Sequence, residues 1–302
     1  MTHTAPFAVV TVNYGSSSLI AENFAELDLG PHGRLVIVDS FSSEAERESV
    51  RRVAAELGAE CVLLDDNRGY GGGTNAGAAR ALELGAEVIV PLNPDARIGA
   101  ADLHRIVEAA QGTRDLVSPR IVTGSGKNWF AGADLYLDDG TTAGRAARPR
   151  REGRARREWA TGACFALSAS VWSELGGFDE EYFLYWEDID LSHRVLDAGG
   201  SLILDVDAVV VHDEGGTHED GAADRAKSPT YYYYNIRNRM MYARKHLDRD
   251  AVRRWGRSSM RVGYGILLQG GRRQLLSTAP WRAYLRGLRD ARRVSRQPEP
   301  AR

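Results

Sequence analysis

The sequence has few cysteines. Cys61 and Cys164 are the only two among 302 residues, and each lies inside an apolar segment. This spacing excludes a disulfide framework and a zinc site built on paired cysteines. We expect both to be small buried side chains, and we expect a reducing compartment, the cytoplasm.

Segments for export or membrane insertion are lacking as well. The chain begins MTHTAPFAVVTVNYG, in which no basic region precedes the short apolar run, unlike a secretory signal peptide. No uninterrupted apolar stretch reaches the roughly 20 residues that a spanning helix needs. We therefore expect a soluble protein, or one that is peripheral at the inner face of the cell membrane.

The composition is that of a globular protein, with 43% hydrophobic and 26% charged residues. Its formal net charge of -2 hides a segregation of sign. From Arg237 onward there are 18 Lys and Arg against 4 Asp and Glu, whereas the preceding residues have 21 against 37. Such segregation favours a C-terminal surface that meets an anionic partner.

Four short apolar runs are spaced along the first part of the chain, at residues 7–12, 35–38, 61–64 and 88–92, with helix-like segments among them. Near-continuous apolar strands separated by helices predict a parallel sheet that is covered on both faces. We interpret residues 1–120 as a nucleotide-binding α/β half. Two further strands are expected at 201–204 and 208–211, and an Arg- and Gly-rich loop at 145–157.

Each of the first four runs ends in polar residues. One such residue is typical of a turn or a helix cap, but four strand ends with polar groups favour a ligand site at the carboxyl edge of the sheet. The residues concerned are Thr11, Asn13, Tyr14, Asp39, Asn67, Asn93 and Asp95.

A glycine-rich segment, GYGGGTN, covers residues 69–75. It follows the third run rather than the first, and no Lys-Ser or Lys-Thr pair closes it, so it is neither a Walker A loop nor a dinucleotide fingerprint. We interpret its glycines as letting the backbone approach a bound nucleotide or sugar.

Three acids, Glu187, Asp188 and Asp190, directly follow the aromatic residues of 182–186. Carboxylates beside apolar rings are costly to charge, because desolvation and like-charge repulsion both favour the protonated form. Such a cluster is typical of a general base, a metal site or a solvated helix start, and the acids alone do not choose among these.

Several strings in this order resemble family 2 glycosyltransferases, especially their bacterial rhamnosyltransferase-like branch. TGA at 161–163, GGFDE at 176–180 and FLYWEDIDL at 183–191 resemble the acceptor side of that family. NRGYGGGTNAG at 67–77 and NPD at 93–95 resemble its donor side. His212, in a His-x-x-Gly-[Ser/Thr]-like element, and the Arg-Asn element at 235–239 complete the resemblance, which covers about residues 7–246.

The resemblance implies a GT-A fold, an α/β architecture in which two halves share one mixed sheet. The Rossmann-like nucleotide-sugar-binding half would cover 1–120, the acceptor and catalytic half 121–246, and a helical basic extension 247–302. It also implies inverting transfer of a sugar, L-rhamnose or a related deoxysugar from a dTDP donor, to a hydroxyl of a glycan or lipid-linked glycan.

The resemblance also implies roles for individual residues. Asp188 would be the base, with Glu187 beside it, and Asp95 and His212 would hold Mg²⁺ or Mn²⁺. Asp39 would recognise the pyrimidine base. The remaining donor-binding residues would be Thr11, Asn13, Tyr14, Asn67, Gly69, Asn75 and Asn93, joined by Asp95, and the acceptor-binding residues Thr161, Gly162, Trp186 and Glu187.

Two other functions stay open. A sugar-phosphate nucleotidyltransferase shares this layout, but residues 13–18 lack the Arg and Lys expected after its first strand. A catalytically silent nucleotide-sugar-binding subunit is the other alternative, and the presence of both Asp95 and Asp188 argues against it.

The basic segment from Trp255 to Arg296 interleaves aromatic and aliphatic residues with arginines. It suits peripheral contact with an anionic membrane surface. The alternative is packing on the catalytic domain or on a second subunit of a homodimer. Nucleic acid is not expected as a partner, since no recognised binding module accompanies the charge.

Overall fold

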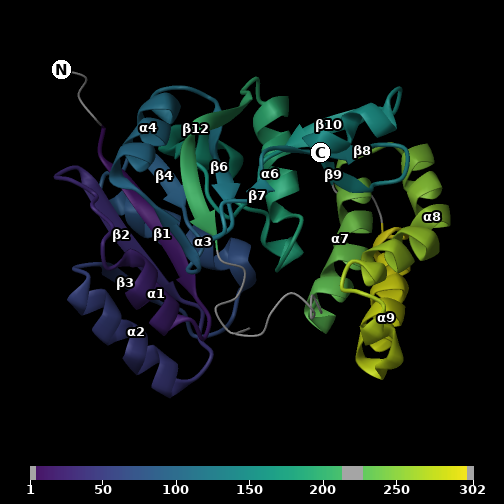
Figure 1. Ribbon diagram of the computed structural model, residues 1–302, viewed down its shortest axis with the longest axis horizontal. Helices are drawn as coiled ribbons and strands as arrows, with labels where there is room; N and C mark the ends of the chain where they lie inside the picture. Colours follow the sequence, from purple (N-terminus) through teal and green to yellow (C-terminus); the bar gives the residue numbers. More distant parts are fainter. Residues whose placement is uncertain (1–4, 213–226, 298–302) are drawn as a thin grey trace. The chain divides into compact units, whose positions relative to one another are not determined.

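The computed structural model describes residues 5–212 and 227–297, which divide into two compact units (Figure 1). The first, here called the sheet unit, contains residues 5–133, 158–183 and 187–212. The second, the helical unit, contains residues 134–157, 184–186 and 227–297. Both units are therefore built from segments that are discontinuous in sequence.

A five-stranded sheet forms the centre of the sheet unit. Its strands follow the order β11-β4-β1-β2-β3. The four predicted runs form its parallel strands, which confirms the α/β prediction, and β11 joins the edge antiparallel. The bounds are β1 (Phe7–Asn13), β2 (Gly33–Asp39), β3 (Glu60–Leu63), β4 (Val88–Pro91) and β11 (Leu167–Ser168).

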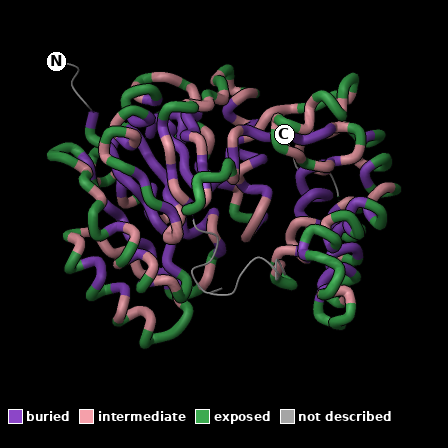
Figure 2. The backbone as a smooth tube through the Cα atoms, in the orientation of Figure 1, coloured by how far each residue is buried: buried purple, intermediate pink, exposed green. Residues whose placement is uncertain are grey.

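Successive residues of β1 serve two different cores, because strand side chains alternate between the faces of a sheet. Phe7 and Val9 pack with α1 (Ser17–Phe24), α2 (Glu44–Glu56) and α4 (Ala100–Ala110). Ala8 and Val10 pack in a second cluster with α3 (Gly69–Glu83), α5 (Ala169–Leu175) and α6 (Glu187–Asp197). Burial on both faces explains why these strands are apolar throughout (Figure 2).

The glycines after β3 form the first turns of helix α3, and they serve packing. A Cβ on Gly77 would stand 2.4 Å from Val10 Cγ1 and 2.7 Å from Val38 Cγ2, and one on Gly73 would stand 2.7 Å from Val12 Cγ1. The glycines thus let α3 lie directly against β1 and β2. The interpretation that the glycines of 69–75 also let the backbone approach a ligand stays a prediction.

A second, four-stranded sheet has the order β5-β12-β6-β7. The two strands expected at 201–204 and 208–211 form one strand, β12, whose register shifts between Asp205 and Val209. Asp205 Oδ1 accepts the N–H groups of Asp207 and Ala208 at this irregularity. The bounds are β5 (Ala96–Ile98), β6 (Leu116–Val122), β7 (Asn128–Phe130) and β12 (Leu202–His212).

The mixed strand directions expected for the fold are confirmed, since β5 and β11 run antiparallel to the strands they pair with. Strand β11 has only two residues, so its side toward β6 is reduced to one isolated bridge between Val117 and Ala166. A third sheet, of order β10-β8-β9, is formed by β8 (Ala133–Tyr136), β9 (Thr142–Gly144) and β10 (Arg156–Trp159).

The segment expected as a loop at 145–157 is instead the 3₁₀ helix η1 (Arg145–Arg151) followed by the start of β10. Two arginines account for its order. Arg148 donates from both Nε and Nη2 to the buried carboxylate of Asp134. Arg154 reaches both Asp138 and Asp139. Two-point contacts of this kind between arginines and carboxylates order an arginine-rich segment whose composition alone predicts a loop.

Three helices build the rest of the helical unit, which confirms the predicted helical C-terminal region. They are α7 (Pro229–His246), α8 (Arg249–Leu268) and α9 (Thr278–Val294), with the 3₁₀ helix η3 (Arg273–Leu276) between the last two. Tyr232 and Ile236 of α7 pack against Leu267 of α8 and Tyr284 and Leu288 of α9. None of the helices in the described ranges combines the length and the apolarity needed to cross a bilayer.

Candidate active site

The carboxyl ends of β1 and β2 are joined through a buried carboxylate. Asn13 Nδ2 donates to Asp39 Oδ1 at 3.1 Å, and Arg47 Nε donates to Asp39 Oδ2 at 2.9 Å. Ser40 N–H donates to the carbonyl of Asn13. Each carboxylate oxygen of Asp39 therefore has a donor, and its orientation is fixed.

Thr11 and Tyr14 lie on the same strand end but in different surroundings. Thr11 is fully buried, and no hydrogen-bond partner for its hydroxyl occurs within residues 5–212 and 227–297. The ring of Tyr14 is 58% exposed. The structure therefore does not bring these two side chains together.

Asn67 links β2 to the start of α3. Its Oδ1 accepts the Gly69 N–H at 2.8 Å and the Ser40 hydroxyl at 3.3 Å. Gly69 has φ +75°, and a Cβ there would stand 1.9 Å from the carbonyl oxygen of Phe183. Glycine is therefore required, because both the left-handed backbone and this close approach exclude other residues.

Asn75 braces a turn before the acidic cluster. Its Nδ2 donates to the Phe178 carbonyl at 2.8 Å and to Glu180 Oε1 at 3.1 Å, while its Oδ1 accepts the Phe178 N–H. In this structure the Asn75 amide therefore holds protein groups in position.

A second polar cluster brings Asn93, Asp95 and His212 together. His212 Nε2 lies 3.1 Å from Asp95 Oδ1 and 3.3 Å from Asn93 Nδ2. The imidazole packs on the ring of Trp129, with centroids 4.5 Å apart, and is only 6% exposed. The pair predicted as metal ligands is thus adjacent, with the His ring held by an aromatic neighbour.

The geometry of Asp95 and His212 fits a shared divalent ion. Adjacent ligands of an octahedral ion stand roughly 3 Å apart, which matches the separation of these two atoms. The carboxylate oxygen suits Mg²⁺ or Mn²⁺, whereas the imidazole nitrogen is a better ligand for a transition metal such as Mn²⁺ than for Mg²⁺. No group of three or more His, Cys, Asp or Glu side chains that could hold a metal ion occurs within residues 5–212 and 227–297.

A third cluster surrounds Asp188 in the first turn of α6. Asp188 Oδ2 accepts the Gly162 N–H at 3.1 Å, and Oδ1 accepts the Ile189 N–H at 2.8 Å. Tyr70 donates its hydroxyl to the Gly162 carbonyl at 2.5 Å. The adjacent Ala163 carbonyl accepts the Asn93 N–H at 3.0 Å. One backbone segment therefore connects Asp188 to the strand end that bears Asn93.

Thr161 begins this connecting segment. Its hydroxyl oxygen accepts the Ala163 N–H at 3.3 Å, and the residue is 6% exposed. Thr161 and Gly162, both predicted on the acceptor side, are therefore brought next to Asp188.

The three acids of the cluster have different environments. Burial raises the pKa of Asp188 to about 6, although the two backbone N–H groups oppose that rise. The pKa of Glu187 is raised well above its usual range by burial and by the neighbouring Asp188. Asp190 forms an ion pair with Arg194 at 2.7 Å, and Arg194 also donates to the Leu175 carbonyl.

These environments separate the roles of the acids. Asp188, with a pKa of about 6, loses its proton near neutral pH, burial favours the protonated form of Glu187, and Asp190 anchors a turn through Arg194. Asp188 therefore has a pKa suited to proton transfer near neutral pH.

The backbone immediately before the acids has an unusual conformation. Phe183, Tyr185 and Trp186 all have positive φ, at 56°, 64° and 78°. Fully buried Asn238 donates from Nδ2 to the carbonyls of Leu184 at 2.9 Å and Tyr185 at 2.8 Å. Left-handed conformations at bulky residues are costly and persist only where surrounding contacts enforce them.

Asn238 lies in the Arg-Asn element at 235–239, but its contact with the carbonyls of Leu184 and Tyr185 was not predicted. The crowding of four aromatic residues directly before the acids was the available signal. Trp186, predicted to bind the acceptor, packs inside the helical unit. Its indole donates to Asn235 Oδ1, and its ring lies 5.8 Å from that of Tyr242.

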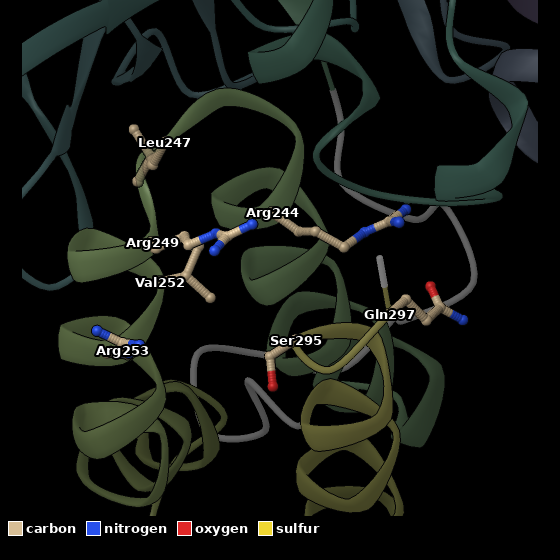
Figure 3. A pocket seen from close by; sticks show the side chains of 7 residues that line it. All are labelled: Arg244, Leu247, Arg249, Val252, Arg253, Ser295 and Gln297. Atoms are coloured by element: carbon tan, nitrogen blue, oxygen red, sulfur yellow. The ribbon is translucent and has the colours of Figure 1, made fainter. Parts of the chain in front are cut away.

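A separate cavity of about 290 Å³ lies in the helical unit (Figure 3). Side chains from both ends of the α7–α8 connection and from the end of α9 surround it, and three of them are arginines. None of the residues predicted for the site lines it. The lining residues are Arg244, Leu247, Arg249, Val252, Arg253, Ser295 and Gln297.

The raised pKa of Glu187 predicts that this carboxyl affects stability in a pH-dependent way. The folded protein keeps this carboxyl protonated to a higher pH than the unfolded chain does. Glu187 therefore lowers the free energy of unfolding increasingly as the pH rises above about 4.3, the pKa of Glu in the unfolded chain. Glu187→Gln should therefore raise the melting temperature at about pH 8 and change it little at about pH 4.

Thermal unfolding at the two pH values measures this effect. Glu56→Gln, at an exposed acid of α2, is the matched control and should show no pH-dependent gain. An equal change in melting temperature at both pH values for Glu187→Gln would contradict the assignment of a buried, protonated carboxyl.

Comparison with known proteins identifies relatives of low identity. The hexosyltransferase Agl10 of low-salt glycan biosynthesis in Haloferax volcanii is 27% identical over 194 residues, which are 62% of this chain and 60% of the relative. The N-acetylglucosaminyl-diphospho-decaprenol L-rhamnosyltransferase of Mycobacterium tuberculosis is 24% identical over 241 residues, 70% of this chain and 76% of that protein. The chain thus spans less than two thirds of the first relative.

A solved structure and a family model agree with these relatives. The mannosyltransferase PcManGT from Pyrobaculum calidifontis, solved with GDP-Man and Mn²⁺, matches with a TM-score of 0.53 at 16% identity, over 97% of this chain and 88% of that one. This likeness concerns the fold and confirms the GT-A prediction. The model described as glycosyl transferase family 2 matches residues 8–170, more than half of the chain. The chain therefore belongs to glycosyl transferase family 2.

Proposed function

We propose that the protein transfers a sugar from a nucleotide-sugar donor to a hydroxyl of a glycan or lipid-linked glycan acceptor, with inversion at the anomeric carbon. The observation that carries this proposal is the buried Asp188 carboxylate, which has a pKa of about 6 and is held by the Gly162 N–H. The same short segment reaches Asn93, next to Asp95 and His212. A base and a site for a charged leaving group are therefore part of one rigid unit.

Asp188 acts as the general base. Its carboxylate accepts the proton of the acceptor hydroxyl while that oxygen attacks the anomeric carbon. The bond from the anomeric carbon to the diphosphate oxygen breaks, and the diphosphate departs with the electron pair. Attack opposite the leaving group inverts the configuration, and the proton passes from Asp188 to solvent.

Asp95 and His212 would hold a divalent ion, which when bound would supply positive charge beside the departing diphosphate. Asn93 stands beside both side chains, and its amide donor remains 3.3 Å from His212 Nε2. Neutral Asn93 keeps the site less negative than a second carboxylate would, which suits an anionic donor.

The donor's base and ribose bind at the ends of β1 and β2. Asp39 is the residue that recognises the pyrimidine, and Thr11, Asn13, Tyr14 and Asn67 are further donor-binding residues. The unpartnered buried hydroxyl of Thr11 and the fixed carboxylate of Asp39 support this assignment. Gly69 and Asn75 complete the donor side by shaping the start of α3.

The sugar is L-rhamnose or a related deoxysugar, delivered from dTDP. Support comes from the motif strings of residues 161–191 and from the mycobacterial relative, whose name specifies an L-rhamnosyltransferase acting on a diphospho-decaprenol-linked sugar. Thr161, Gly162 and Glu187 bound the acceptor side next to Asp188. The ring of Trp186 packs within the helical unit, so Trp186 contributes to the acceptor side only through its backbone, which directly precedes Glu187.

A panel of nucleotide sugars, assayed for release of the nucleoside diphosphate with Mn²⁺ present, tests the function. We expect dTDP-rhamnose to give the fastest release in the presence of a glycan-diphosphate lipid analogue. Release of no nucleoside diphosphate from any donor would support the silent binding subunit instead.

Asp188→Asn should lower turnover by about 10²-fold or more, because a positioned base is lost. Donor binding should be unchanged. In the native protein turnover should fall below about pH 6, since Asp188 gains its proton there. Asp197→Asn, on the last turn of the same helix, is the control. Near-native turnover by folded Asp188→Asn would reject the assignment.

Asp95→Ala should weaken metal-dependent donor binding, since a hard oxygen ligand is removed. Calorimetric titration of donor with Mn²⁺ and with EDTA measures this dependence. Asp66→Ala, at an exposed acid after β3, should bind as the native protein does. If the native protein binds donor equally well in EDTA, the metal role of Asp95 and His212 is wrong.

Asn238→Asp should lower kcat by about 10-fold to 100-fold through misplacement of the segment that leads to Asp188. A carboxylate cannot donate to the carbonyls of Leu184 and Tyr185, and it would repel them. The donor KM should change little, because the proposed donor-binding residues lie in the sheet unit, whereas Asn238 lies on α7 of the helical unit. Asn128→Asp, at an exposed position of β7, is the control. Equal losses in kcat and in donor affinity would indicate general unfolding rather than positioning.

A further inference from the structure

Large exposed apolar side chains gather at one place in the helical unit. Met260, Tyr264 and Leu268 of α8 are 59%, 41% and 38% exposed, Leu276 of η3 is 92% exposed and Leu285 of α9 is 63% exposed. Single exposed apolar residues are ordinary, but a contiguous group indicates an interaction surface.

Contacts between the elements show that this group is continuous. Met260, Tyr264 and Leu268 recur at helical spacing on the solvent side of α8. The ring of Tyr264 stacks on Trp281 of α9 at 6.2 Å, and the Trp281 indole donates to the Leu275 carbonyl. Leu285 follows Trp281 by one helical turn. The turn between α8 and α9 and the adjoining helix surfaces therefore form one face, here called the hairpin face.

The charge of the hairpin face is of one sign. Between Ala251 and Arg289 the chain has nine arginines and no Asp or Glu. Arg261 reaches Asp139 at 3.3 Å, whereas the following four form no ion pair within the part of the chain that the structure describes: Arg257, Arg272, Arg273 and Arg282. Arg272 and Arg273 lie four and three residues before Leu276.

We infer that the hairpin face inserts its apolar side chains into the interface of an anionic lipid bilayer. Exposed aliphatic side chains flanked by arginines match this partner, since the aliphatic groups enter the acyl boundary while the guanidinium groups remain among the phosphates. A second copy of the chain matches poorly, because pairing two such faces would bring like charges together. The inference deepens the proposed function, since it places the enzyme where a lipid-linked acceptor is found.

Insertion of apolar side chains and charge attraction by arginines respond differently to salt. Attraction by arginines alone is screened by salt and disappears at high ionic strength. Burial of Leu268, Leu276 and Leu285 is not screened, so part of the binding should persist. Both the arginines and the leucines are therefore needed for full binding at low salt.

Co-sedimentation with vesicles tests the inference without donor or acceptor, so the result does not depend on the proposed activity. The full chain is mixed with vesicles of phosphatidylcholine alone or of phosphatidylcholine with phosphatidylglycerol, at low and at high salt. We expect binding to the anionic vesicles, reduced but retained at high salt, and little binding to the neutral ones.

Two sets of variants separate the contributions. Leu268→Ser with Leu276→Ser should lower the partition coefficient by about 10-fold or more at both salt concentrations. Arg272→Gln with Arg273→Gln should lower it by about 10-fold at low salt and much less at high salt. Val206→Ser, at an exposed apolar residue of β12 in the sheet unit, is the matched control and should bind as the native chain does.

Circular dichroism and light scattering complete the test. Variants that keep native helicity and lose binding support the inference. It is overturned if the native chain does not bind anionic vesicles, or if the leucine variant binds as tightly as the native chain. It is also overturned if the native chain is a dimer in solution that the leucine variant converts to a monomer, because the hairpin face would then join two copies.

Discussion

The hydrogen bond from the Gly162 N–H to Asp188 is the interaction on which the arrangement of the site depends. A carboxylate removed from water stays ionised only when donors replace its hydration, and Gly162 and Ile189 supply them. Space restricts residue 162, since a Cβ there would stand 3.3 Å from the Tyr70 ring and 3.4 Å from Asp188 Cβ. Because the next carbonyl, that of Ala163, accepts from Asn93, the same bond also fixes Asp188 relative to the strand end that carries Asp95.

This arrangement costs stability in two places, and the rest of the fold offsets it. Glu187 is buried beside an ionised neighbour, and the preceding residues adopt left-handed conformations at bulky side chains. Asn238 satisfies two carbonyls of that strained segment, and Trp186 adds a buried ring to the helical unit. Local rules are broken next to a proposed base, where natural proteins commonly accept strain for function.

The sequence predicts features that depend on neighbours along the chain, and it fails where distant residues decide. The four parallel strands follow from apolar runs, because burial on both faces requires them. The role of Asn238 depends on a contact 54 residues away, at Leu184, and no local pattern contains it. The packing role of Gly73 and Gly77 was not predicted for the same reason, since their neighbours Val10, Val12 and Val38 lie on strands that only the fold brings near. The order of residues 145–157 likewise rests on Asp134 and Asp138.

The arginines of the C-terminal segment have two different roles, and their number in the sequence does not distinguish these roles. Arg239 is 2% exposed, and its guanidinium donates to the Asp139 and Trp255 carbonyls and lies 4.9 Å from the Trp255 ring. Burial lowers its pKa to about 9, so it remains charged at neutral pH and ties α7 to α8. Arg272, Arg273 and Arg282 have no such partners among the described residues. Interior arginines therefore hold α8 in place, and that fixed helix is what allows the exposed arginines and leucines to occupy a single face.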